Sequence, residues 1–140
     1  MSARKLLLFR VAGRVFALEA GVVREVLPAA RPTRIPGAPP AVRGLVNVRG
    51  TLVAVLDVGL AVGARAEPAD GPLVLVELPP RLLGLAVDEV LDLVAVEDAA
   101  LDDRSSLPGV RPGLVQAVGS AGGEAFVQLA TDALLAPLLP

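Results

Sequence analysis

The chain has 140 residues and a formal net charge of −2, and hydrophobic residues make up 54% of it while aromatic residues make up 2%. This length suits one domain or two very small ones, with a core that must be built from Leu, Val and Ala. The chain contains neither Cys nor His, which excludes disulfides, thiolate chemistry and the commonest general base and metal ligand.

Most apolar segments are short, rich in Val and Leu, and separated by Gly or Pro, which is typical of strands in a barrel or sandwich. The predicted strands are Leu6–Val11, Arg14–Leu18, Thr51–Leu56, Leu73–Leu78, Leu82–Val87, Val90–Val96, Leu114–Val118 and Ala125–Leu129. We expect three turns to join neighbouring strands as hairpins, at Ala12-Gly13, Pro79-Pro80 and Ser120–Gly123.

Helix is predicted only in short pieces. The apolar residues of Glu19–Leu27 recur with helical spacing, and Pro28 ends that segment. Thr131–Leu139 opens with Thr and Asp as cap candidates, and Pro137 keeps it short. A single turn is expected over Pro39–Gly44, which has Pro at its start and Gly at its end.

Two stretches rich in Pro and Gly are predicted as connections. Pro28–Pro40 is expected to be a rigid segment docked on the surface, with a short strand at Thr33–Ile35, and Gly63–Pro72 a loose polar loop. A weak internal repeat relates Gly13–Leu18 to Pro80–Leu85, with the sequences GRVFAL and PRLLGL. A true repeat would indicate two similar small barrels packed together.

No pattern in the chain favours catalysis, and no cofactor or metal is expected. Both glycine-rich phosphate-binding patterns are absent, and a Ser triad cannot be assembled without His. Ser105 and Ser106 have no neighbouring base. The acidic cluster Glu97–Asp103 could hold a divalent cation loosely, but its spacing fits no calcium loop, so a solvated loop or a capped turn is predicted. Asp88 and Asp92 could face each other as a carboxylate pair.

Charge and hydropathy leave recognition of another protein as the default function. Like charges form no block and aromatic residues are few, so nucleic acid is a poor partner. Arg10 and Arg14 interrupt the first apolar run before it reaches the length of a signal peptide, and no later run could span a bilayer. We therefore expect a soluble, cytoplasmic protein without direct membrane insertion.

Three segments carry a family resemblance. Thr33–Val58, with the sequence TRIPGAPPAVRGLVNVRGTLVAVLDV, resembles the signature region of the CheW-like coupling proteins of bacterial chemosensory systems. The family pattern there is T-x-[IL]-P-x-[AT]-P, a glycine, and then [LV]-x-N-[LV]-R-G before a hydrophobic strand. Leu82–Val94 and Phe9–Leu27 resemble two further family motifs. The matches follow the family's order and cover nearly the whole chain.

The resemblance implies a mainly β fold, in which two small five-stranded SH3-like barrels (Src-homology-3-like) share a hydrophobic seam and carry short helical pieces. It implies one domain over residues 1–140, made of two intertwined barrels. It also implies a non-catalytic adaptor, monomeric in isolation and recruited to chemoreceptor arrays. Its partners would be the cytoplasmic tip of a chemoreceptor (a methyl-accepting chemotaxis protein) and the regulatory domain of a CheA-type histidine kinase.

The resemblance also assigns site residues. Receptor contacts are expected from Val23, Glu25, Asn47, Arg49 and Leu93, and a kinase contact near Gly44. Each position has a plain structural alternative. Asn47 could cap the turn and Arg49 could pair with a nearby carboxylate, which is compatible with binding. Val23 and Leu93 could be core residues, Glu25 an ordinary exposed residue, and Gly44 could serve the backbone.

The chain departs from the family pattern after its central strand. Where the family usually has D-L-R, this chain reads Asp57-Val58-Gly59, and Gly59–Ala66 lacks the usual basic residues. Its apolar side chains could fold inward or form an exposed patch. The alternative function is therefore a divergent protein that binds receptor but binds kinase weakly. Outside the family, the alternatives are a small nucleic-acid-binding barrel and a small enzyme.

Overall fold

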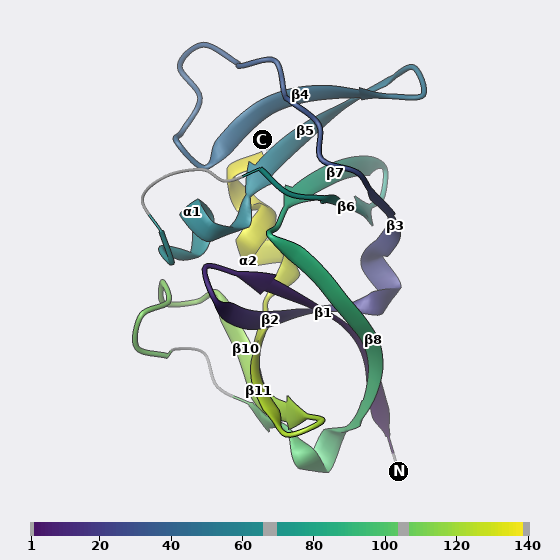
Figure 1. Cartoon of the computed structure of the whole chain (residues 1–140), viewed down its shortest axis with the longest axis vertical. Coiled ribbons are helices and arrows are strands. Elements are labelled where there is room, and N and C mark those ends of the chain that lie inside the picture. The colour runs from purple at the N-terminus through teal and green to yellow at the C-terminus, as the bar shows by residue number, and fades with distance from the viewer. Residues whose placement is uncertain (1, 66–69, 104–106, 139–140) are drawn as a thin grey trace.

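A computed structural model describes residues 2–65, 70–103 and 107–138, and these residues form a mainly β protein (Figure 1). The strands are β1 (Ala3–Val11), β2 (Arg14–Glu19), β3 (Val23–Leu27), β4 (Val42–Val48), β5 (Thr51–Asp57), β6 (Leu73–Leu78), β7 (Arg81–Ala86), β8 (Glu89–Glu97), β9 (Asp102–Asp103), β10 (Val115–Ala121) and β11 (Glu124–Leu129). The helical pieces are α1 (Val58–Val62) and α2 (Thr131–Leu135), with 3-10 turns η1 (Ala20–Val22), η2 (Asp98–Ala100) and η3 (Ala136–Leu138).

The strands form two curled sheets that occupy the two halves of the molecule (Figure 1). One sheet has the order β8-β1-β2-β11-β10-β9 and the other the order β3-β6-β7-β5-β4. The strand directions in the two sheets match. β1 and β2 form an antiparallel hairpin, and β2 runs parallel to β11. In the same way, β6 and β7 form an antiparallel hairpin, and β7 runs parallel to β5. The sheets are therefore two copies of one topology, which confirms the internal repeat between the segments containing β2 and β7.

The two copies are interleaved along the chain. The second sheet takes its strands from one continuous stretch, residues 23–86, whereas the first combines β1 and β2 with strands from β8 onward. The strand that follows each hairpin crosses to the other sheet, since β3 pairs with β6 and β8 pairs with β1. Each sheet therefore contains one strand, β8 in the first and β3 in the second, that directly follows the hairpin of the other sheet.

A single apolar seam joins the two sheets. Its buried residues include Phe9 and Phe16 of the first sheet, whose rings lie 6.2 Å apart, and Leu56, Val74 and Leu85 of the second. Smaller clusters fill the interior of each sheet separately. The expected seam between two barrels is confirmed; the first sheet gains a sixth strand, the two-residue β9, beyond the five that were expected.

All eight predicted strands are present, and so are the three predicted hairpins. In the first hairpin, Ala12 and Gly13 both take positive φ, at 51° and 76°. A two-residue turn of this kind matches the right-handed twist of the strands it joins. Short runs rich in Val and Leu between Gly and Pro were thus a sufficient signal for most of the β structure.

The helix predicted over Glu19–Leu27 is wrong. Only the three residues of η1 are helical, and Val23–Leu27 forms β3, which pairs antiparallel with β6. Solvent exposure in β3 alternates from residue to residue, as expected for a strand. The helical spacing of its apolar residues therefore does not decide the local structure. β-Branched valines favour that outcome, because they pack well on a pleated surface.

The remaining predictions of local structure are partly right. The turn at Pro39 exists, with Val42 donating its amide hydrogen to the Pro39 carbonyl, but β4 begins at once and includes Gly44. In the predicted strand Thr33–Ile35, only Thr33 makes an isolated bridge, to Leu45. The C-terminal helix ends in η3, its N-cap is Ala130 and no side chain caps it. Leu139 and residues 66–69 of the predicted loop lie outside the described residues.

Candidate functional site

A surface hollow forms where the edge strand β3 and the β4–β5 turn approach β6 and β7. Its volume is about 410 Å³, and its lining residues are Val23, Arg24, Glu25, Arg49, Leu75, Glu77 and Leu82. Three of the five predicted receptor-contact residues, Val23, Glu25 and Arg49, therefore lie together although the chain separates the first two from the third by more than twenty positions. We call this feature the Arg49 hollow.

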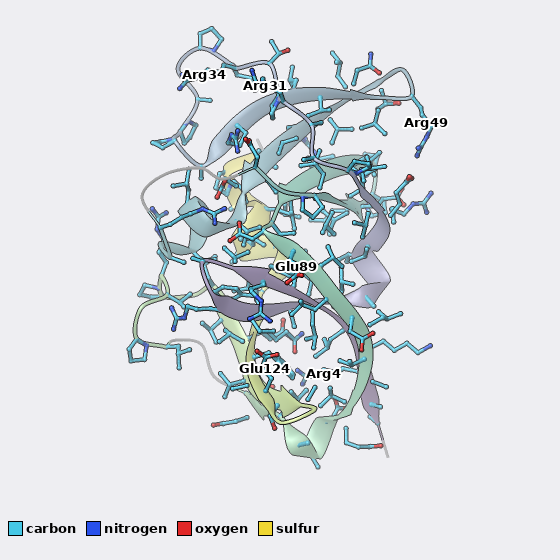
Figure 2. All side chains as sticks on the ribbon, in the orientation of Figure 1. Arg4, Arg31, Arg34, Arg49, Glu89 and Glu124 are labelled. Carbon is cyan, nitrogen blue, oxygen red and sulfur yellow. The ribbon has the colours of Figure 1, made fainter. Side chains whose placement is uncertain are left out.

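Arg49 and Glu25 form a two-pronged ion pair across the Arg49 hollow. The Nη1 and Nη2 atoms of Arg49 donate to Oε1 and Oε2 of Glu25 at 3.1 and 2.5 Å. Figure 2 shows the Arg49 side chain at the β4–β5 turn, directed back towards the rest of the sheet. Parallel hydrogen bonds fix the plane of the guanidinium as well as its distance. The Arg49 side chain keeps 69% of its surface exposed, so it is both held in place and open to a partner.

Both members of this pair stay charged near neutral pH. The hydrogen bond from Arg49 lowers the pKa of the Glu25 carboxyl below its ordinary value, and the charges of Arg49 and Arg24 act in the same direction, while burial opposes them. The same hydrogen bond and charge raise the pKa of Arg49. An unlike charge nearby favours the ionised form of each group.

Asn47 shapes the turn that presents Arg49. Its Oδ1 atom accepts a hydrogen bond from the Gly50 amide at 2.8 Å, and Arg49 itself takes a positive φ of 48°. A side-chain amide that closes a tight turn in this way is a common use of Asn. The expected capping role of Asn47 is therefore confirmed, as is the pairing of Arg49 with a carboxylate; direct contact of either residue with a receptor stays a prediction.

Leu93 and Val23 have different settings. Leu93 lies on β8 in the other sheet with 59% of its surface exposed, so it is no core residue, and it does not line the Arg49 hollow. Val23 is half-buried and packs against the shared seam while it also lines the hollow. The fold thus brings Val23 to Glu25 and Arg49 but leaves Leu93 apart from them.

Gly44 serves the backbone. It is buried at a bulge in β4 with a φ of 133°, and a Cβ atom there would collide with the backbone carbonyl of Thr33. Thr33 and Leu45 exchange two backbone hydrogen bonds of 2.8 Å beside it. Only glycine allows this approach between the Pro-rich connection and β4. The kinase contact expected near Gly44 remains a prediction.

A buried ion cluster, which sequence reasoning did not identify, joins the two sheets. Asp57 is fully buried at the end of β5 and interacts with Arg65 at 3.4 Å and with Arg43 at 3.6 Å. Arg65 also holds Asp88 through contacts of 2.7 and 2.9 Å. Asp88 stands where the chain crosses from β7 to β8, and its Oδ2 atom accepts from the Ala12 amide at 2.8 Å. We call these four acidic and basic side chains the Asp57 cluster.

The departure from the family's D-L-R pattern has a structural counterpart in the Asp57 cluster. Gly59 has no side chain, and a Cβ atom there would lie 2.6 Å from Nε of Arg65, so the glycine leaves room for that guanidinium. Arg65 therefore occupies the space beside Gly59 and supplies a positive charge to Asp57. A missing Arg at position 59, followed by an Arg six positions later, was the available sequence signal.

Most of the apolar residues after Asp57 fold inward. Asp57 caps α1 by accepting the Leu60 amide hydrogen at 3.0 Å, and Gly63 ends the helix with a φ of 80°. Val58, Ala61 and Val62 are buried within α1, so the inward outcome holds for these side chains, whereas Leu60 is only half-buried. Ala66 lies outside the described residues.

The other acidic candidates are held by basic or backbone groups. Asp98 and Asp103 pair with Arg4 at 2.9 and 3.2 Å, and Arg4 also donates to the buried Gln128. Of the possible carboxylate pair, Asp92 accepts the amide hydrogen of Leu93 and Asp88 binds Arg65, so each side chain has another partner.

Within the described parts of the chain, no three His, Cys, Asp or Glu residues gather as metal ligands, and no helix could cross a membrane. The predicted capped or solvated loop over Glu97–Asp103 instead contains η2 and β9. Ser105 and Ser106 lie outside the described residues.

Comparison with known proteins points to one family. Residues 5–137 match the CheW-like domain. The chain is 34% identical over 97 residues to the chemotaxis protein CheW of Rhizobium meliloti, covering 68% of this chain and 63% of that protein. It is 37% identical over 87 residues to protein PilI of Pseudomonas aeruginosa, covering 61% of this chain and 49% of the relative. The chain thus spans less than two thirds of these relatives.

The fold comparison agrees. The crystal structure of the scaffolding protein TtCheW from Thermoanaerobacter tengcongensis superposes with a TM-score of 0.81 at 21% identity, covering 92% of this chain and 90% of that one. At this identity the likeness concerns the fold alone.

Proposed function

The chain belongs to the CheW-like family, and we propose from this that it is a non-catalytic adaptor of a bacterial chemosensory system. In this proposal it links the cytoplasmic tip of a chemoreceptor to the regulatory domain of a CheA-type kinase and helps to assemble receptor arrays. It acts in the cytoplasm, as a single domain that is monomeric in isolation. The observation that carries the proposal is the Arg49 hollow, where the family's N-[LV]-R-G turn meets β3.

The receptor surface of this adaptor centres on Arg49. A guanidinium held by Glu25, with most of its own surface open, is a rigid anchor that loses little side-chain entropy on binding. Val23 supplies apolar wall, and Asn47 holds the turn that presents the anchor. Leu93 adds an exposed apolar contact from β8. Aromatic or arginine anchors with an apolar surround are the usual centre of a protein interface.

Assembly of three components tests the proposal. Receptor-tip fragments arranged on vesicles and soluble kinase would be centrifuged together with and without this chain. We expect the kinase to sediment only when the chain is present, and the Arg49→Ala variant to reduce the amount recovered. An adaptor role would be contradicted if the same amount of kinase sedimented with and without the chain.

A second candidate is the divergent protein that binds receptor but binds kinase weakly. The observation in its favour is the surface of α1 and the residues after it. Arg65 is the one charged residue in 58–65, and it is turned inward onto Asp57 and Asp88. A kinase contact oriented by basic residues of this segment would lose its electrostatic guidance. In the sedimentation experiment this candidate predicts that the chain itself sediments with receptor while the kinase stays in solution.

A further inference from the structure

Two adjoining hollows lie away from the Arg49 hollow, beside α1 and the Pro-rich connection between β3 and β4. Pro40 and Leu60 line both of them, so the two hollows adjoin. The first hollow, of about 500 Å³, carries Arg31, Arg34 and Arg43. The second, of about 540 Å³, is lined mainly by Pro, Ala and Leu side chains and carries Arg111. We call the whole the Arg31 groove.

The Arg31 groove is positively charged on a chain that is negative overall. Four arginines line it, whereas Asp70 is the one acidic residue among its described lining residues. Arg43 is engaged by Asp57 and Asp70. Arg31, Arg34 and Arg111 are exposed, and no ion pair joins them to any residue in the described ranges. Figure 2 shows Arg31 and Arg34 on the same connection at one end of the molecule.

Charge and shape together select the occupant. Positive side chains beside an apolar floor favour a ligand that is acidic and also carries an apolar group. A nucleic acid is disfavoured, because the chain has no Tyr or Trp and its three Phe residues are fully or almost fully buried, which leaves no surface for base stacking. Two hollows in line suit an extended segment better than a single small anion.

We propose that the Arg31 groove binds an acidic, extended segment of another protein, with an apolar side chain of that segment seated on Leu60. Arg31 and Arg34 meet the acidic residues at one end of the segment and Arg111 meets them at the other. This interaction goes beyond the proposed receptor contact, because the groove shares no lining residue with the Arg49 hollow. The two surfaces can therefore be tested separately. Val42 and Arg43 line the groove beside Gly44, near which the adaptor proposal places the kinase contact.

The test uses a synthetic peptide of about ten residues, rich in Glu and Asp with a central Leu, which is long enough to span both hollows when extended. The peptide is titrated into the isotope-labelled full chain and followed by amide chemical shifts. We expect the largest shifts at Arg31, Arg34 and Leu60, with little change at Arg49. Affinity should fall at least about tenfold in the R31E/R34E variant and weaken as salt is raised.

Control variants separate charge from general effects. The R81E variant reverses an exposed arginine on β7 outside the groove and should leave the affinity unchanged. Leu60→Ala should weaken the peptide with central Leu and spare one with Ser in that place. Equal binding of a peptide with Lys in place of the acidic residues, shifts confined to another face, or no saturable binding below about 1 mM would overturn the proposal.

Discussion

The Arg49 side chain is held in place by Glu25 and is also mostly exposed. We therefore expect Arg49→Ala to affect protein stability and receptor affinity differently. Because its side chain is mostly exposed, Arg49→Ala should barely alter the thermal midpoint, since exposed ion pairs contribute little to stability. If Arg49 anchors the receptor tip, the same change should weaken receptor affinity by about tenfold or more. Calorimetric titration with receptor-tip fragments measures this, with Arg81→Ala as an exposed control. A lower midpoint with unchanged affinity would make Arg49 a structural residue only.

Glu25 sets the pH range in which the Arg49 hollow keeps its form. Its pKa is lowered by Arg49, so the pair contributes stability above the ordinary carboxyl pKa and loses it as pH falls through the lowered value. Arg49, with its pKa raised, stays charged at any pH where the protein is studied. Receptor affinity should therefore be flat from about pH 6 to 8. Carbon NMR of the Glu25 carboxyl should report a pKa lower in the wild type than in Arg49→Ala; equal values would contradict the pairing.

Gly44 offers a matched pair of substitutions with Gly50. Both glycines have positive φ, but a Cβ at Gly44 meets the Thr33 carbonyl whereas a Cβ at Gly50 meets nothing within 4 Å. Gly50→Ala should cost about 1–2 kcal/mol for the backbone alone. Gly44→Ala should cost more, about 3 kcal/mol or above, because the connection must also move. Urea unfolding measures both; equal costs would show that the Thr33 contact adds nothing. A kinase defect of a Gly44 variant therefore needs a folding control.

At the scale of elements, the Asp57 cluster ties α1 to the turn of the first hairpin. Arg65→Ala removes one partner of fully buried Asp57 and should lower the free energy of unfolding by about 3 kcal/mol. Arg10→Ala is the matched control, because Arg10 pairs with Glu89 and Glu124 at 3.5 and 3.6 Å on the surface and should cost under about 1 kcal/mol. Similar losses in both variants, measured in urea, would contradict a stabilising role for the cluster.

The elements also show which signals in the sequence were sufficient. Strands bounded by Gly or Pro were predictable because short runs of Val and Leu and the turn residues around them agree, as in β6. β3 was not predictable, because Val23, Val26 and Leu27 fit the helical spacing, whereas Val26 lies on the exposed face of the strand. The pairing of β3 with β6 also joins residues about fifty positions apart. α1 was missed since glycines at 59 and 63 interrupt the pattern, while a buried aspartate caps it.

The candidate site was predictable only where a motif fixed it. The family resemblance placed Asn47 and Arg49 at a turn; the fold places Arg49 in that turn and Asn47 near the end of β4, where its side chain closes the turn. The partner of Arg49 was not predictable from local sequence. Glu25 reaches Arg49 because β3 pairs with β6, whereas the spacing of its apolar residues predicts a helix. The role of Arg65 was not predictable, because it depends on space left by Gly59 and on Asp88 in the connection between β7 and β8.

At the scale of the whole molecule, interleaving of the two sheets argues for one cooperative unit. Each sheet relies on a strand that follows the other copy's hairpin, and the seam between them is the largest apolar cluster among the described residues. We expect a single unfolding transition in which far-ultraviolet circular dichroism and calorimetry coincide. Two separated transitions, or a stably folded fragment of residues 23–86, would show that the copies are independent domains.

Binding to both partners is the central claim, and calorimetric titration of the purified chain with each of them tests it most directly. The partners are a receptor-tip fragment and the kinase regulatory domain from the same organism, at physiological salt. The adaptor proposal predicts saturable binding to both in about the low micromolar range, with Arg49→Ala weakening the receptor titration and sparing the kinase titration. Heat from the receptor alone would support the divergent candidate, and the absence of receptor binding by the folded chain would contradict both.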